Sequence, residues 1–262
     1  MKGTGNILGT VLSAAVVLLI LLCLAVSAGI GRSIREDTLC SGIAVTIRDS
    51  SENRFVSEAD IKEYIAGEYG KTEGVPAADI DLKKIEAILD SRSAVLKSEA
   101  WCTRDGLLNI SITQRRPIMR FQKKGTGFYA DADGYIFPMK EGRSSYVVVI
   151  DGNIPLDLGS AGRGKATAGK ERVWLDRMTA LVTYMERHKV WAEDIVQIHV
   201  KGNGDLVLIP REGKERFLFG KPVSVEEKFN LMEHYYTGVV PAMGKDRYTS
   251  VDVRYRGQII CR

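Results

Sequence analysis

The most regular hydrophobic pattern in the chain is an uncharged apolar run near its amino terminus. Residues 7–30 read ILGTVLSAAVVLLILLCLAVSAGI, and no charged residue lies between Lys2 and Arg32. A helix needs about 20 apolar residues to cross a bilayer core, so this run predicts a single transmembrane helix behind a cytoplasmic head of residues 1–6. The small residues at 25–28 also suit a cleaved signal peptide. The apolar part of a signal peptide usually spans only about 7–15 residues, which favours a retained anchor.

Beyond this run, the hydrophobic positions follow the periods of short strands and helices. Residues 43–47 alternate as a strand does. Ser57 and Asp60 form a capping-box pattern that opens a helix ending near Gly70. A second helix is expected from Asp81. The residues at helical spacing that it should bury are Leu82, Ile85 and Leu89.

Two further strands complete this first module. Residues 95–101 and 107–112 have strand patterns, and the turn residues 104–106 separate them. The order strand, helix, helix, strand, strand predicts a small sheet covered on one face by two helices. We place this module at residues 39–120.

The second region, residues 121–262, is predicted to be a mixed β-rich domain with two flanking helices, so the fold class is α+β. The expected strands are residues 128–138 with a turn at 132–134, residues 146–150, the hairpin 195–210, residues 217–219 and a terminal strand within 248–262. One helix is expected at residues 171–189, with a buried stripe of Trp174, Met178, Leu181 and Met185. The other should open at Ser224, which forms a second capping-box pattern with Glu227, and bury Val225, Phe229, Met232 and Tyr236.

Composition narrows the classes of function. The chain has 37 Lys and Arg against 33 Asp and Glu, and this small excess gives no electrostatic footprint for nucleic acid. Cys23 lies in the apolar run, whereas Cys40, Cys102 and Cys261 lie outside it. Their spacing matches no metal motif and no disulfide framework. One disulfide among these three cysteines is possible, but three buried thiols are the favoured interpretation.

One segment invites comparison with a phosphate-binding loop. Gly159, Gly164 and Lys165 have the required spacing, but Ala166 stands where a hydroxyl should help to hold Mg²⁺. Such a loop joins a strand directly to a helix. Here Pro155 interrupts the approach, so we predict a Gly-rich surface loop that binds no nucleotide.

No other group of residues suggests catalysis. His188, His199 and His234 have no carboxylate paired with them locally, and each is interpreted as structural. Asp131 and Asp133 lie in a D-x-D-G pattern that is typical of a hairpin turn. The sequence therefore predicts no enzyme, no metal site, no cofactor and no small-molecule substrate.

An ordered series of segments resembles the FtsQ/DivIB family of bacterial cell-division proteins. The segments are NRFVSEADI (53–61), VLKSEAW (95–101), GLLNISITQRRP (106–117), FYADADGYIFP (128–138) and SVDVRY (250–255). The first three are similar to the family's POTRA domain, and the last two to its β domain. Lys97, Glu99 and Trp101 look most like the Bacteroidota branch.

The resemblance implies a non-catalytic scaffold that links early division proteins to the FtsB/DivIC–FtsL complex and, indirectly, to the FtsW/FtsI-type synthases of septal peptidoglycan. The expected location is the inner membrane at the division septum, with one span and a periplasmic carboxy-terminal domain. Two alternatives are a POTRA-type envelope assembly factor and a membrane-anchored periplasmic enzyme. The first would need a transmembrane barrel after the module, and the second a convergent polar site.

The partner site is expected on the terminal strand. Alternation from Ser250 to the last residue predicts one continuous strand, with Val251, Val253, Tyr255, Ile259 and Cys261 facing the core and Asp252 and Arg254 facing outward. POTRA sheets and terminal strands are expected to leave backbone edges free, and a free edge can accept a partner strand. The resemblance places an FtsB-type strand near Tyr255. The predicted partner-binding residues are Arg254, Tyr255, Arg256, Gly257, Gln258, Ile259 and Ile260, with the arginines facing acidic partner residues.

Overall fold

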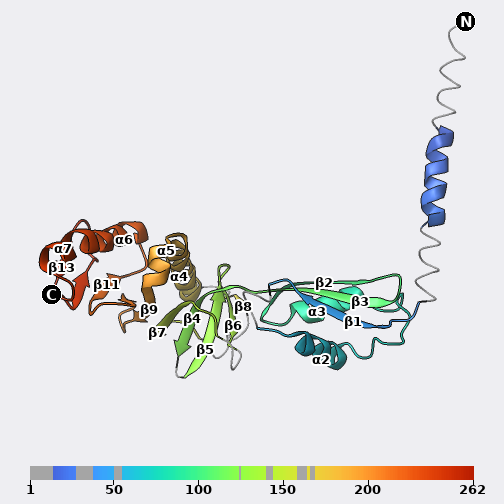
Figure 1. Ribbon diagram of the computed structural model, residues 1–262, viewed down its shortest axis with the longest axis horizontal. Coiled ribbons are helices and arrows are strands. Elements are labelled where there is room, and N and C mark those ends of the chain that lie inside the picture. The colour runs from blue at the N-terminus through green and yellow to red at the C-terminus, as the bar shows by residue number, and fades with distance from the viewer. Residues whose placement is uncertain are drawn as a thin grey trace, which may run out of the picture. The chain divides into compact units, whose positions relative to one another are not determined.

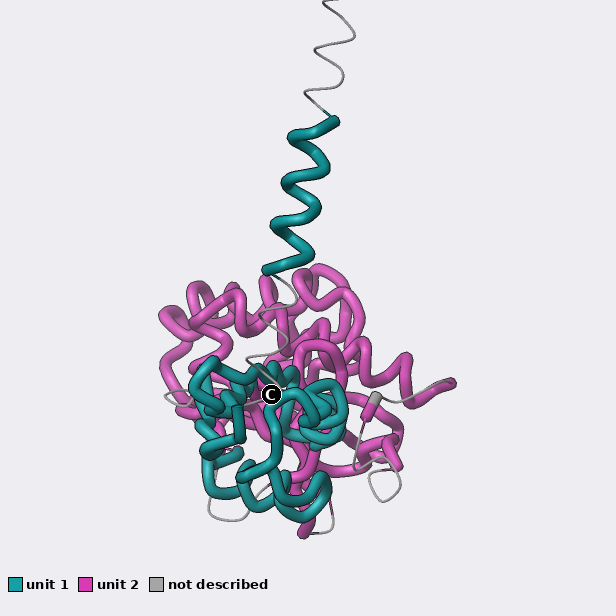
Figure 2. Tube along the Cα trace, turned by 90° about the vertical axis from the view of Figure 1, so that its right-hand side faces the viewer, with its two compact units in different colours: residues 1–50, 56–113 teal, residues 51–55, 114–262 magenta. Residues whose placement is uncertain are grey.

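The computed structural model describes residues 14–27, 38–49, 55–123, 125–139, 144–157, 164–165 and 169–262. The chain divides into two compact units, residues 1–50 with 56–113 (unit 1) and residues 51–55 with 114–262 (unit 2), as Figure 2 shows. Residues 14–27 form the helix drawn in blue in Figure 1, and its apolar side chains are exposed.

None of the helices in the described ranges is both long and apolar enough to span a bilayer. Residues 7–13 and 28–30 of the predicted span, and the predicted head at residues 1–6, lie outside the described residues. The transmembrane helix therefore stays a prediction.

Unit 1 has the predicted order of elements. Its sheet contains β1 (Gly42–Ile47), β2 (Val95–Cys102) and β3 (Leu107–Gln114) in the order β1-β3-β2, with β1 parallel to β3. Its helices are α2 (Glu58–Glu68) and α3 (Leu82–Asp90). Figure 1 shows this unit in blue to green.

Local signals set the helices of unit 1. Ser57 accepts a hydrogen bond from the Asp60 amide, and the Asp60 side chain accepts one from the Ser57 amide, which confirms the capping box. Ile85 and Leu89 of α3 are fully buried, as their spacing predicts. The rest of this core comes from α2, from residues of the three strands, and from Cys40, Val56 and Ile80 in the connecting segments.

The described residues of unit 2 form a ten-stranded mixed sheet in the order β13-β12-β11-β10-β9-β7-β4-β5-β6-β8. Its strands are β4 (Pro117–Lys123), β5 (Thr126–Asp131), β6 (Tyr135–Pro138), β7 (Val148–Gly152), β8 (Gly164–Lys165), β9 (Ile195–Val200), β10 (Leu206–Pro210), β11 (Arg216–Gly220), β12 (Ser250–Asp252) and β13 (Ile260–Cys261). The β5–β6 and β9–β10 hairpins agree with the sequence pattern.

The helices of unit 2 are α4 (Gly169–Arg187), α5 (Lys189–Asp194), α6 (Val225–His234), the π-helix η1 (Tyr235–Val239) and α7 (Val240–Met243). Side chains of α4, α5, α6 and η1 share one apolar core with the sheet. The stripe of α4 is centred on Leu175, Met178 and Leu181, while Trp174 lies at its edge and is only half-buried.

The predicted capping box of the second helix and the predicted end of the first module are both wrong. Ser224 precedes α6 but makes no capping hydrogen bond, and its backbone is left-handed (φ 52°) instead of the extended conformation that is usual for a capping residue. Residues 117–120 were predicted to belong to the first module, but β4 pairs with β5 and β7. The boundary between the two units therefore lies before Pro117. The sequence could not show this, because an alternating pattern does not specify which sheet a strand joins.

The segment that resembles a phosphate-binding loop has a different structure in its described part. Gly164 and Lys165 form β8, which pairs with Ile136 and Tyr135 of β6. In a phosphate-binding loop the lysine opens a helix, whereas here it is part of a sheet. The prediction of a surface loop is corrected for these two residues, and the residues on either side lie outside the described ranges.

Candidate partner-binding site

The carboxy-terminal segment reverses direction instead of forming the single strand that its alternation predicts. β12 pairs in parallel with β11 and in antiparallel with β13. Between them the Gln258 amide donates to the Tyr255 carbonyl at 3.2 Å, and Gly257 has a φ of 68°. Glycine adopts this left-handed conformation without a steric penalty, so Gly257 permits the turn.

The reversal changes which side chains face the core. Val251 and Val253 are buried, as predicted. Asp252 is also buried, with 3% of its surface exposed, whereas Tyr255 is 51% exposed, and both were predicted to face the opposite way. Because β12 ends at Asp252, strand alternation no longer determines where the later side chains point.

At the start of the turn the buried Asp252 forms an ion pair with Arg254, whose side chain is 38% exposed. Arg254 Nε donates to Asp252 Oδ1 at 2.9 Å, and its second guanidinium nitrogen donates to Oδ2 at 2.6 Å. Hydrogen bonding from Arg254 holds the pKa of Asp252 below its usual range, against the opposing effect of burial. A further ion pair joins Arg254 to Asp205 at 3.6 Å. The guanidinium is therefore engaged mainly within the unit.

The other cations beside the turn have different environments. Arg256 lies 3.3 Å from Glu227 of α6, but its side chain is 92% exposed. Lys228 is buried and donates to the Lys221 carbonyl at 2.7 Å. Burial lowers the pKa of Lys228, although Asp205 and Glu227 partly offset this effect. Arg256 is thus more exposed than Arg254, whose side chain is 38% exposed.

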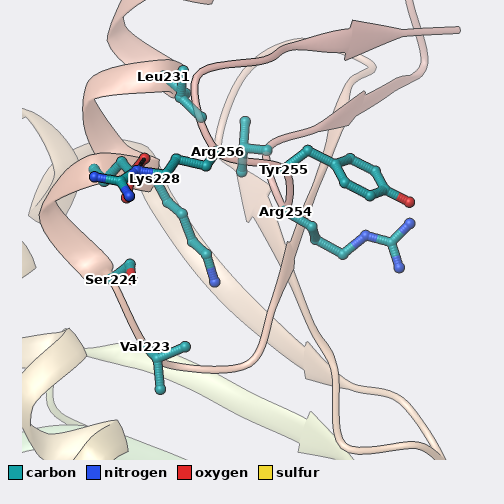
Figure 3. Close-up of a pocket in the computed structure, with 9 residues that line it drawn as sticks. Val223, Ser224, Lys228, Leu231, Arg254, Tyr255 and Arg256 are labelled. Atoms are coloured by element: carbon teal, nitrogen blue, oxygen red, sulfur yellow. Dashed lines mark ion pairs between the residues drawn. The ribbon is translucent and has the colours of Figure 1, made fainter.

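A groove of about 390 Å³ lies between the turn and the start of α6. Its lining residues are Val223, Ser224, Glu227, Lys228, Leu231, Val253, Arg254, Tyr255 and Arg256. Figure 3 shows Arg256 reaching back toward α6, whereas the side chains of Arg254 and Tyr255 project away from that helix. Sequence reasoning missed the contribution of α6, because no local pattern indicates that its first turn lies beside residues 253–256.

β13 is the last strand of the sheet order and has one unpaired side within the described residues. Arg262 exchanges two backbone hydrogen bonds with Ser250, at 2.9 and 3.1 Å. In an antiparallel pair the backbone groups of the preceding residue then face the other way, so the Cys261 amide and carbonyl point away from β12. Of the predicted site, Arg254 to Ile259 lie in or beside the turn, and Ile260 lies in this edge strand.

The remaining polar candidates have structural contacts. Asp131 Oδ1 accepts from the amides of Asp133 (3.0 Å) and Tyr135 (2.8 Å), which confirms the hairpin turn. His199 lies 2.9 Å from Asp151, a partner 48 residues away that the local sequence could not indicate. The described residues contain no group of three or more potential ligands that could hold a metal ion. Cys40, Cys102 and Cys261 form no disulfide in the described part of the chain, and Cys40 alone of these is buried, so the prediction of three buried thiols is wrong for Cys102 and Cys261.

Two acidic side chains of unit 2, Asp194 at the end of α5 and Glu215 just before β11, interact electrostatically. Glu215 is buried and accepts from the Tyr236 hydroxyl at 2.9 Å. Asp194 Oδ2 is buried and has no hydrogen-bond partner among the described residues. Burial raises the pKa of Asp194, and the nearby charges of Glu215 and Glu212 raise it further.

Comparison with known proteins identifies both units. A family described as FtsQ/DivIB, C-terminal related matches residues 116–262, and a POTRA-like domain family matches residues 38–113. A search of curated proteins gave no match. The first matched region contains the whole terminal turn, the groove and the edge strand.

Proposed function

Because this chain belongs to the FtsQ/DivIB family, we propose that it is a non-catalytic scaffold of the bacterial division machinery, anchored in the inner membrane through residues 7–30. The POTRA-like unit and the β-rich unit would lie in the periplasm, and the protein would gather at the division septum. The matches over residues 38–113 and 116–262 support this role, since together they cover nearly all of the chain beyond the apolar run.

The partner in this proposal is an FtsB/DivIC-like protein that adds a strand to β13, bringing FtsL-like and synthase components with it. One observation carries this choice of site. The terminal turn exposes Tyr255 beside an edge strand whose Cys261 backbone groups point outward. Main-chain hydrogen bonds would supply affinity, and a half-exposed tyrosine is a common binding anchor.

Charge should act mainly on the rate of association. Arg256 is the more exposed arginine, so it is the better candidate to meet an acidic residue of the partner. Arg254 is held by Asp252 and contributes through the shape of the turn. Raised salt should therefore slow association more than it speeds dissociation.

The test measures binding of an FtsB/DivIC-like ectodomain to the full chain in detergent micelles. Tyr255→Ala should weaken binding about tenfold or more, the size expected for a central aromatic anchor. Tyr146→Ala is the matched control, because Tyr146 is 78% exposed and precedes β7, well away from β13 in the sheet order. Cys261→Pro should also weaken binding, since it removes an outward amide and spares the bonds to β12.

Gly257→Pro is not a clean probe, because proline requires a φ near −65° and Gly257 has a φ of 68°. If Tyr255→Ala and Cys261→Pro are both folded and bind as wild type does, the partner docks elsewhere. A fluorescent fusion tests the division role separately. Uniform envelope fluorescence would contradict that role, whereas midcell fluorescence with unchanged binding would contradict only the site.

A further inference from the structure

The end strands of the two described sheets differ in whether their outer backbone groups are hydrogen-bonded, and the clearest case is β2. β2 ends the sheet of unit 1 and has β3 as its neighbour in that sheet. A strand in this position normally presents a row of unpaired amide and carbonyl groups on its outer side. Leu96 and Trp101 on the same strand are 48% and 44% exposed, so an open β2 edge would be apolar as well as unpaired.

Two carboxylates of α3 occupy the outer amides of β2. The Ser98 amide donates to Asp90 Oδ1 at 2.7 Å, and the Ala100 amide donates to Glu86 Oε1 at 2.8 Å. The Ser98 hydroxyl also donates to Asp90 Oδ1 at 2.7 Å and to the Glu86 carbonyl at 3.2 Å. The edge that the sequence suggests is free is therefore already hydrogen-bonded.

The spacing of these groups explains the fit. Glu86 and Asp90 are four residues apart, which corresponds to ~6 Å along α3 at ~1.5 Å per residue. Ser98 and Ala100 are two residues apart in a strand, or about 6.6 Å. Helix α3 thus presents acceptors at nearly the repeat of the outer amides, as the carbonyls of an added strand would.

The side chains of β2 indicate which strand would otherwise bind. Lys97 and Glu99 flank Ser98 on the same face of the strand and form an ion pair with each other. Antiparallel pairing of two β2 strands about Ser98 would set Lys97 of each copy opposite Glu99 of the other. Opposite charges stabilise such a cross-strand pair, so β2 is complementary to itself.

We infer that Glu86 and Asp90 close the β2 edge and thereby prevent two copies of the chain from pairing through β2. This contact inhibits self-association through β2. The inference depends on unit 1 alone and stands independently of the proposed division partner.

The first measurement is hydrogen exchange on the full-length wild-type chain in detergent micelles. The Ser98 and Ala100 amides should exchange slowly, although they lie on the outer side of an edge strand. In Glu86→Ala/Asp90→Ala they should exchange at least about tenfold faster at low protein concentration. Fast exchange of both amides in the wild type would overturn the inference whether or not any variant folds.

The second measurement is the molecular mass of the same chains by sedimentation. Glu86→Ala/Asp90→Ala should dimerise, with the protein mass doubling as concentration rises. Glu63→Ala/Glu68→Ala removes two exposed acidic residues from α2 and should stay monomeric. Glu86→Gln/Asp90→Asn should also stay monomeric, because an amide oxygen still accepts the strand amides. A folded, monomeric Glu86→Ala/Asp90→Ala chain would overturn the inference.

A charge exchange identifies the pairing strand. Adding Lys97→Glu to Glu86→Ala/Asp90→Ala places glutamates opposite each other and should abolish the dimer. Adding Glu99→Lys as well restores opposite charges and should restore it. A dimer that is indifferent to these changes forms through another surface and contradicts pairing through β2.

Discussion

The end strands β2 of unit 1 and β13 of unit 2 differ in how they are stabilised and in whether their outer backbone groups are hydrogen-bonded. In unit 1, β2 lies over a core in which Ile85, Leu89 and Val95 are fully buried, and helix carboxylates occupy its outer amides. In unit 2, the buried Asp252 of β12 forms an ion pair with the exposed Arg254, and β13 keeps an open side among the described residues. At β2, helix carboxylates accept from the outer amides, so a partner strand cannot bind them. At β13, the ion pair of the preceding turn leaves the outer backbone groups accessible.

The first prediction tests whether the burial of apolar side chains of α3 stabilises unit 1. Leu89→Ala should lower the free energy of unfolding of unit 1 by roughly 2–5 kcal/mol, through lost transfer energy and a residual cavity. Hydrogen exchange measured at increasing urea concentrations gives the free energy of unfolding of each unit separately. Lys83→Ala on the exposed side of α3 is the control and should change stability very little. Equal losses for the two variants would contradict the assigned helix face.

The second point depends on the ion pair at the terminal turn. Arg254→Ala leaves the Asp252 carboxylate buried with fewer hydrogen-bond donors and should cost unit 2 about 1–3 kcal/mol. The same urea titration measures the loss. Arg254→Lys keeps a charge but not the two-pronged hydrogen bond, and it should fall between the wild type and alanine. If Arg254→Ala leaves the free energy of unfolding of unit 2 unchanged, the ion pair does not stabilise the turn.

Acid should expose the same pair without a mutation. The folded state lowers the pKa of Asp252, so this carboxylate contributes stability above its unfolded pKa of ~3.9 and loses that stability as pH falls toward the folded pKa. Unit 2 of the wild type should weaken over this range. Arg254→Ala should weaken less steeply. Identical acid profiles for the two chains would contradict the assignment.

The smallest expected effect concerns Asp194. Its charge is unfavourable in the folded state, because burial and the charge of Glu215 raise the pKa of its carboxyl group. The folded pKa of Asp194 is raised, so its contribution to stability is fully present below its unfolded pKa and is lost as pH rises through the folded value. Asp194→Asn should therefore stabilise unit 2 at neutral pH by a modest amount, on the order of 1 kcal/mol or less. The gain should vanish near pH 3. Destabilisation at pH 7 would show that the Asp194 charge is needed.

Local sequence patterns were sufficient for much of unit 1 and for the hairpins of unit 2. The capping box of Ser57 and Asp60, the buried pair Ile85 and Leu89, and the Asp131 turn all depend on residues within four positions of one another. Helix periodicity, capping and turn chemistry act at this range, so the sequence alone determines them.

The candidate site was only partly accessible to the same reasoning. Its residues, Arg254 to Ile260, could be named from the sequence, but their arrangement could not. Alternation predicts a continuous strand, and only Gly257 within RYRGQI hints at the turn that the structure contains. The exposure of Tyr255 follows from that turn.

What the sequence by itself determined is the order and type of most elements and the family, whereas the place of the partner site stays a prediction. The tertiary structure alone decided that Asp252 is buried against Arg254, that α6 lines the groove, and that Glu86 and Asp90 close β2. Each of these depends on how helices and strands pack against one another within a unit. Such pairings are set by the packing of the whole unit, and short-range periodicity carries no information about them.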